Sequence, residues 1–241
     1  MKILIKKKKS FTKKDHLIVL NDKNSDLAKF KLTISEINFI NKSKKEITQI
    51  NQYNRQLFII NHKKNTDKNK QNENFRMLGH QLFKKTSELT SIQIIDNHKI
   101  NDENKNLNLK IAEGLALSSY QFLKHKSKPQ ANKLKTIYLC EKVERQDIIE
   151  LQNIINAVFF TRDLVNEPFS HLTAKDLANA SKNIGKKFNI KTKVFNKKKI
   201  ESLKMGGLLA VNKGSLDEPT FTIMEWKPKN AKNKKPIVFV G

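Results

Sequence analysis

The sequence predicts an α/β fold with at least partly parallel sheets, and three observations support this prediction. Short apolar runs of strand length alternate with stretches in which apolar residues recur at three- and four-residue spacing, as on a helix. One long helical pattern lies between two strand-rich halves. It stops at Pro168, because proline has no N–H to donate. We therefore expect an N-terminal α/β domain with a mixed sheet, a connecting helix, and the beginning of a second α/β domain.

The first half of the chain contains apolar runs bounded by polar residues, which predict strands. These runs lie at residues 2–5, 17–20, 56–60, 91–95 and 133–140. Residues 63–74 offer almost nothing to bury and predict an exposed loop. A helical period begins at Phe75.

A second helix of the first half is expected from an apolar stripe and a ridge of small residues. The stripe consists of Leu107, Ile111, Leu115 and Phe122. The ridge consists of Ala112, Ala116 and Ser119. Small side chains let a neighbouring backbone approach closely, so we expect this helix to pack tightly on a sheet.

The second half repeats the order of helix and strand. Thr173 and Asp176 have the spacing of a capping box that starts a helix. Strands are expected at residues 191–195, 221–226 and 236–240, and a short helix at 197–204. At residues 205–207 we expect a helix stop, because glycine adopts positive φ without strain.

The formal net charge of the 241 residues is +25, which raises the question of nucleic-acid binding. Arginine occurs only at positions 55, 76, 145 and 162, so lysine supplies nearly all of the 48 basic residues. Lysine lacks the planar fork that makes bidentate phosphate and base contacts, and the lysines are spread along the whole chain. Specific nucleic-acid binding is therefore not expected.

The composition also bears on location. No stretch approaches the roughly 20 apolar residues needed to cross a bilayer, and the apolar start is too short for a secretory signal. We expect a cytoplasmic protein without a membrane partner. The single cysteine, Cys140, lies in a strand-like run and predicts a buried, inert thiol.

A search for local catalytic motifs finds none. The six histidines show no HExxH spacing, and no Gly-rich phosphate loop or Gly-x-Ser-x-Gly elbow occurs. Several acidic residues could in principle hold a metal ion, but we interpret them as structural because they lie at expected helix ends and turns. They are Asp163, Glu167, Asp176, Asp217 and Glu218.

Three segments carry a family resemblance, in the right order and at plausible spacing. They are residues 111–127, 161–173 and 205–215. The Arg162-Asp-Leu-Val-Asn-Glu-Pro168 element is the most specific, and residues 75–82 add a weaker match. On these residues the chain resembles the leucyl aminopeptidase family of metallopeptidases over roughly residues 70–241.

The resemblance implies an N-terminal α/β domain at residues 1–142, then a connecting helix and the incomplete start of a catalytic domain at residues 143–241. Such enzymes release N-terminal amino acids, often leucine, from peptides and assemble as homo-hexamers when full length. They use two divalent metal ions, manganese or zinc, to polarise the scissile carbonyl. Two departures, Pro168-Phe-Ser-His171 for Pro-Pro-Asn and Gly207 where alanine is common, affect only detail of the substrate loop.

In the family, the first metal-binding lysine follows the Val-Gly that this chain reaches at Val240-Gly241, and the other ligands come later. We therefore assign no catalytic, metal-binding or cofactor-binding residue to this chain. It is expected to bind no ion and to be inactive alone, as the front part of a longer enzyme. Its last apolar residues, 237–240, would then form an open edge prone to pairing or aggregation.

A different class of function is also compatible with the sequence. The chain could be a non-catalytic binding or subunit-assembly protein that uses its basic N-terminal domain to contact nucleic acid or a partner chain. That alternative predicts binding that weakens as salt rises.

Overall fold

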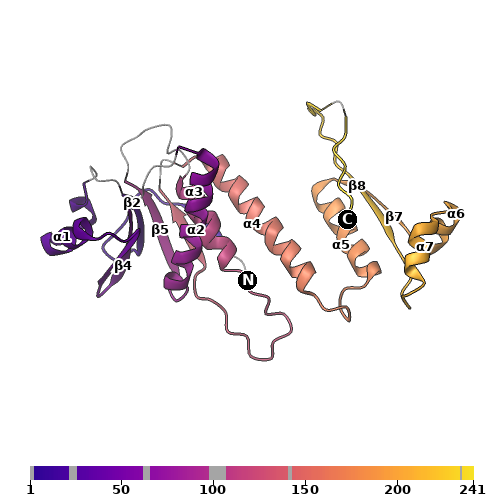
Figure 1. The fold of residues 1–241 in the computed structure, drawn as a ribbon, viewed down its shortest axis with the longest axis horizontal. Coiled ribbons are helices and arrows are strands. Elements are labelled where there is room, and N and C mark those ends of the chain that lie inside the picture. Colours follow the sequence, from indigo (N-terminus) through magenta and orange to yellow (C-terminus); the bar gives the residue numbers. More distant parts are fainter. Residues whose placement is uncertain (1–2, 22–25, 62–65, 98–106, 141–142, 234) are drawn as a thin grey trace. The chain divides into compact units, whose positions relative to one another are not determined.

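The computed structural model describes residues 3–21, 26–61, 66–97, 107–140, 143–233 and 235–241. The chain divides into two compact units, Met1–Arg162 and Asp163–Gly241, called unit 1 and unit 2 below. Figure 1 shows helices and strands in both, so the predicted α/β class is confirmed. The domain boundary implied at residues 142 and 143 concerns the family's domains and stays a prediction.

Unit 1 is built on a six-stranded sheet with the order β1-β6-β5-β2-β4-β3. All neighbouring pairs are parallel except β3 and β4, which form an antiparallel pair. The strands are β1 (Leu4–Lys7), β2 (Leu17–Asn21), β3 (Ile47–Gln52), β4 (Arg55–Asn61), β5 (Ser91–Asp96) and β6 (Thr136–Leu139). The strands expected from apolar runs are confirmed, and the mixed sheet with them.

Among the described residues, five helical segments accompany this sheet, and the last of them continues into unit 2. They are η1 (Ala28–Phe30), α1 (Ile34–Lys42), α2 (Lys68–Thr86), α3 (Leu107–Ser118) and α4 (Arg145–Asn166). In Figure 1, α2 and α3 lie side by side next to β5. Glycine permits this close crossing, because a Cβ at Gly79 would overlap the backbone carbonyl of Ile111 and one at Gly114 that of Arg76.

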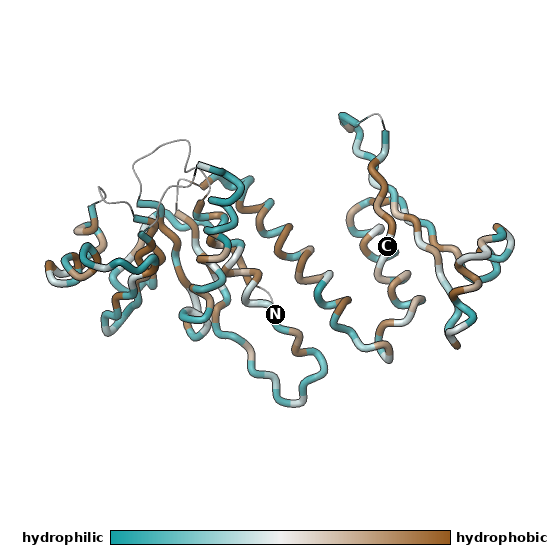
Figure 2. The backbone as a smooth tube through the Cα atoms, in the orientation of Figure 1, coloured by the Kyte–Doolittle hydropathy of each residue, from teal (hydrophilic) through white to brown (hydrophobic). Residues whose placement is uncertain are grey.

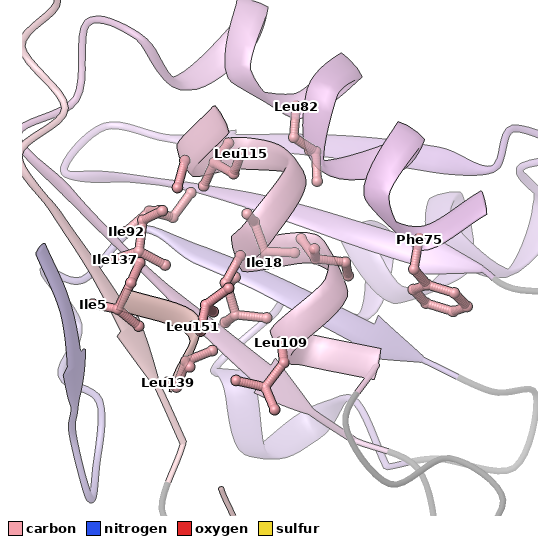
Figure 3. Packing of buried hydrophobic residues seen from close by; sticks show 14 of the residues in the cluster. Ile5, Ile18, Phe75, Leu82, Ile92, Leu109, Leu115, Ile137, Leu139 and Leu151 are labelled. Carbon is pink, nitrogen blue, oxygen red and sulfur yellow. The ribbon is translucent and has the colours of Figure 1, made fainter. Parts of the chain in front are cut away.

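The core of unit 1 lies on both faces of the sheet. Strand side chains alternate between faces, so Ile18 joins the cluster under α2, α3 and α4, whereas Leu17 joins the cluster that contains Phe30. Figure 3 shows the larger cluster, with Leu115 and Leu151 facing strand residues such as Ile137. Strands buried on both faces have continuous apolar sequences, which is why they could be predicted from the sequence.

Unit 2 contains less regular structure. Its elements are α5 (Ala174–Phe188), β7 (Lys191–Phe195), α6 (Lys197–Ser202), α7 (Gly206–Asn212) and β8 (Phe221–Glu225). Strands β7 and β8 pair antiparallel in a two-stranded sheet. The predicted capping box is confirmed: the Asp176 N–H donates to Thr173 Oγ1 at 3.3 Å, and the Thr173 N–H donates to the Asp176 carboxylate at 2.9 Å.

Several sequence predictions were wrong. Residues 68–74 are helical rather than loop, because Asp67 caps α2 and Gln71 and Phe75 are buried on the unit 1 core. The second helix ends at Ser118, so Phe122 lies outside it. Helix α1 and strand β3 were missed, since neither carries a continuous apolar run.

Two further errors concern unit 2. Residues 206–207 begin helix α7 instead of stopping a helix, and the positive φ, 55°, falls on Lys204. Residues 236–240 form no strand. Their apolar side chains have the composition of a strand, but a strand exists only when a neighbour accepts and donates its backbone hydrogen bonds.

Candidate functional site

The structure joins two of the segments that carried the family resemblance. Arg162, in the 161–173 segment, donates from Nη1 to the backbone carbonyl of Leu117 in α3 at 2.7 Å. Its guanidinium also lies over the ring of Tyr120, 5.4 Å from the centroid. Tyr120 in turn makes an edge-on contact with Phe159 of α4. The end of α4 is thereby fixed on the end of α3.

Sequence reasoning missed this contact. Arg162 and Leu117 are 45 residues apart, and no local pattern links an arginine to a distant carbonyl. The only signal was indirect, because both residues belong to segments with the family resemblance.

Residues 168–173 form a tight turn between α4 and α5. The backbone N–H groups of His171 and Leu172 both donate to the carbonyl of Pro168, at 2.8 and 3.1 Å. Ser170 Oγ and His171 Nδ1 lie 2.9 Å apart. Hydrogen bonds from the Thr173 side chain and backbone hold the pKa of the Asp176 carboxyl below its usual value, so Asp176 serves the helix start.

The third segment, residues 205–215, forms α7 and the turn that follows it. Asn212 Nδ2 donates to the backbone carbonyl of Asp217 at 2.7 Å, and the Asp217 N–H donates to Ser215 Oγ at 3.2 Å. Glu218 pairs with Lys175 at 3.1 Å. The hydrogen bond and positive charge of Lys175 lower the pKa of the Glu218 carboxyl.

The described residues do not fit a metal centre. Within the ranges given above, no three His, Cys, Asp or Glu side chains come close enough together to hold a metal ion. Cys140 is half-buried, and its Sγ accepts from Asn108 Nδ2 at 3.3 Å. The assignment of no catalytic, metal-binding or cofactor-binding residue to this chain stays a prediction.

The last residues of unit 2 expose large apolar side chains. Ile237, Val238, Phe239 and Val240 expose between 71% and 94% of their surfaces. Exposed apolar patches of this kind mark surfaces that contact another polypeptide, a membrane or a ligand, or that aggregate. As for membranes, every helix in the described part of the chain is too short or too polar to span one.

Comparison with known proteins assigns the family. Residues 159–241 match the catalytic domain of the cytosol aminopeptidase family. This part of the chain belongs to that family. The match begins near the end of α4 and includes the segments at residues 161–173 and 205–215, two of those that carried the resemblance to leucyl aminopeptidases.

Curated relatives with the name "Probable cytosol aminopeptidase" support this assignment. The protein of Chlorobaculum parvum is 60% identical over 80 residues, which are 33% of this chain and 16% of that protein. The protein of Clostridium tetani is 34% identical over 193 residues, 77% of this chain and 39% of that protein. The chain thus spans well under half the length of the relatives it matches.

Solved structures of other proteins share the fold of this chain. A tomato leucine aminopeptidase mutant superposes with a TM-score of 0.71 at 18% identity, covering 90% of this chain and 49% of the tomato chain. The bottromycin maturation enzyme BotP in complex with Mn gives 0.68 at 16% identity, covering 90% of this chain and 46% of the BotP chain. The likeness extends over both units.

Proposed function

We propose that this chain supplies the N-terminal domain and the first part of the catalytic domain of a leucyl aminopeptidase-type hydrolase. Such an enzyme releases N-terminal amino acids from peptides in the cytoplasm. The observation that carries the proposal is the match of residues 159–241 to the family's catalytic domain. The hydrogen bond between Arg162 and Leu117, which links two of the resembling segments, supports it.

The proposed enzyme uses two divalent metal ions, manganese or zinc, held by residues other than those described here. BotP, a protein of similar fold, has a complex with Mn, which supports the use of divalent ions. We also propose that the complete enzyme is a homo-hexamer. The polypeptide that covers residues 237–240 would then be the remainder of the catalytic domain.

Assay of the 241-residue chain tests this proposal. The purified chain, with manganese or zinc and a leucyl chromogenic amide, is expected to show no turnover. Co-expression with the remaining catalytic part of the Clostridium tetani relative should restore hydrolysis that a chelator abolishes. Turnover by the chain alone would contradict the proposed location of the metal ligands. Restored hydrolysis that resists chelation would contradict the use of metal ions.

The net charge of +25 favours one alternative, a non-catalytic binding or assembly role. On that alternative the chain binds DNA or RNA with an affinity that falls steeply as salt rises. Titration of a fluorescent oligonucleotide at two salt concentrations distinguishes the two functions, because the aminopeptidase proposal expects only weak binding without sequence preference.

A further inference from the structure

An open hollow of about 530 Å³, called the cavity below, lies at the β3 edge of the unit 1 sheet. The end of α1, the segment that leads into β3, β3 itself and the end of α2 provide its lining. Figure 1 shows α1 and β4, the partner of β3, together at one end of the unit. Strand β3 is the last in the sheet order, so its outer side has no strand neighbour in the described part of unit 1.

At the opposite edge of the sheet, a side chain hydrogen-bonds to the backbone. Gln152 of α4 accepts from the Ile5 N–H at 2.8 Å and donates to the Ile3 carbonyl at 3.2 Å, which gives two backbone groups at the β1 edge a side-chain partner. Residues 47–49 of the β3 edge line the cavity instead. The two edges are therefore not equivalent, and the β3 edge has space for a ligand.

Four lysines line the cavity: Lys42, Lys44, Lys45 and Lys85. Its described lining contains no acidic residue, and none of the four pairs with a carboxylate in the described part of the chain. Lys42 and Lys85 lie in the last turns of α1 and α2, where a cation complements the helix dipole. Lys44 and Lys45 lie outside both helices, so helix ends do not account for them.

A hydroxyl group is oriented as a donor in the same cavity. Ser43 Oγ accepts from Thr48 Oγ1 at 2.9 Å and from the Lys45 N–H at 3.3 Å. Because these two donors occupy its lone pairs, the Ser43 proton is left to donate. In the described part of the chain no acceptor takes that proton.

The cavity also has an apolar wall. Phe39 of α1 is 58% exposed although it is a large aromatic residue, and Ile47 of β3 is half-buried. Lysine binds phosphate as a point charge, and an exposed ring offers a face for an apolar or aromatic group. The wall and the cations together match a ligand with an apolar body and a doubly charged head.

We propose that this cavity binds a small organic phosphate, with the phosphate against Lys44, Lys45 and Ser43 and the apolar body against Phe39 and Ile47. The site lies entirely within unit 1 and does not depend on the aminopeptidase proposal. Lysines at a sheet edge also discourage strand pairing. That protective role alone predicts no ligand, so the two explanations give different results in a binding experiment.

Calorimetric titration of the full chain at low salt tests the proposal with three probes. Phenyl phosphate should bind more tightly than inorganic phosphate, which lacks the apolar body, and more tightly than phenol, which lacks the charge. Equal affinity for phenyl phosphate and inorganic phosphate would overturn the role of the apolar wall. No measurable binding of phenyl phosphate at millimolar concentration would overturn the site.

Matched variants locate the binding. The double variant Lys44→Gln, Lys45→Gln should weaken phenyl phosphate binding about tenfold, since each exposed ion pair contributes modestly. The control Lys126→Gln, Lys128→Gln removes the same charge from exposed positions outside the cavity lining and should leave the affinity unchanged. Equal losses in the two variants would show a general charge effect and overturn the proposal.

A third variant distinguishes the contact with the apolar body of the ligand from the contact with its phosphate. Phe39→Ala should weaken phenyl phosphate binding but leave inorganic phosphate binding unchanged, and circular dichroism would confirm that the fold is retained. If the lysine double variant self-associates in sedimentation while phenyl phosphate binding is unaltered, edge protection alone explains the lysines and the proposal fails.

Discussion

The two compact units differ in how far they bury their apolar side chains. In unit 1 the buried residues form a cluster on each face of the sheet. In unit 2, only Ala178 and Ile200 among the described hydrophobic residues are buried, whereas Leu216 is fully exposed. Figure 2 shows hydrophobic residues along the unit 1 strands and again in the segment that ends at the C label. Unit 1 therefore has a core of its own, and unit 2 lacks one.

The sheets explain this difference. Six strands covered by helices enclose enough apolar surface to offset the entropy of folding. The two strands of unit 2, with α5 packed beside them, enclose little, and two-stranded sheets are marginal in water. This contrast fits a family in which the matched catalytic region is only part of a longer chain.

The largest difference in stability between the units is expected when one leucine in each is replaced by alanine. Leu115→Ala should destabilise unit 1 by about 3 kcal/mol, because the side chain is wholly buried and its removal leaves a cavity. Leu216→Ala should change stability by less than about 0.5 kcal/mol, because that side chain is already exposed. Urea unfolding followed by circular dichroism measures both. Similar losses in the two variants would show that unit 2 buries Leu216.

A glycine pair provides a second test. Gly114→Ala should cost about 2 kcal/mol, because the added Cβ meets the backbone of Arg76 where α2 and α3 cross. Gly207→Ala is the matched control in unit 2, where an added Cβ has nothing within 4 Å. It should be neutral or slightly stabilising, since alanine favours helix. Thermal unfolding of both variants checks this, and a stable Gly114→Ala protein would contradict the tight crossing.

The smallest expected effect is a pH dependence in unit 1. Burial raises the pKa of the Asp15 carboxyl, but hydrogen bonds from Lys8 and Thr12 outweigh burial and hold the pKa below its usual value. A lowered pKa stabilises the fold above the unfolded-state pKa, and the contribution disappears as pH falls through the folded-state pKa.

Asp15→Asn removes this carboxyl and should therefore lessen the loss of stability between neutral and acidic pH. The change should be under about 1 kcal/mol, because the Lys8 pair is partly exposed. Urea midpoints at several pH values measure it. Identical pH profiles for the two proteins would show that the hydrogen bonds of Asp15 make no net contribution.

The sequence was sufficient for the parts of the fold that local patterns encode. Strand β2 was predictable because burial on both faces makes it continuously apolar. The start of α2 was not, because tertiary burial of Gln71 and Phe75 overrides a polar composition. Residues 236–240 were wrongly predicted to form a strand, because apolar composition alone cannot supply a strand with a hydrogen-bonding partner.

The candidate sites too could be predicted only where a local sequence pattern encodes them. The family resemblance was readable from contiguous segments such as the one that contains Arg162, but the contact of Arg162 with Leu117 required the folded chain. The cavity at β3 could not be predicted from the sequence either. Lys44 and Lys45 are adjacent in sequence, whereas Lys85 reaches the same cavity from α2.

Amide hydrogen exchange of the 241-residue chain, read by mass spectrometry, tests the contrast between the units most directly. Exchange reports the free energy of local opening. We expect strong protection of β2 and β4 in unit 1 and weak protection of β7 and β8 in unit 2. Equal, strong protection of both pairs of strands would contradict it, because unit 2 would then be stable without any further polypeptide.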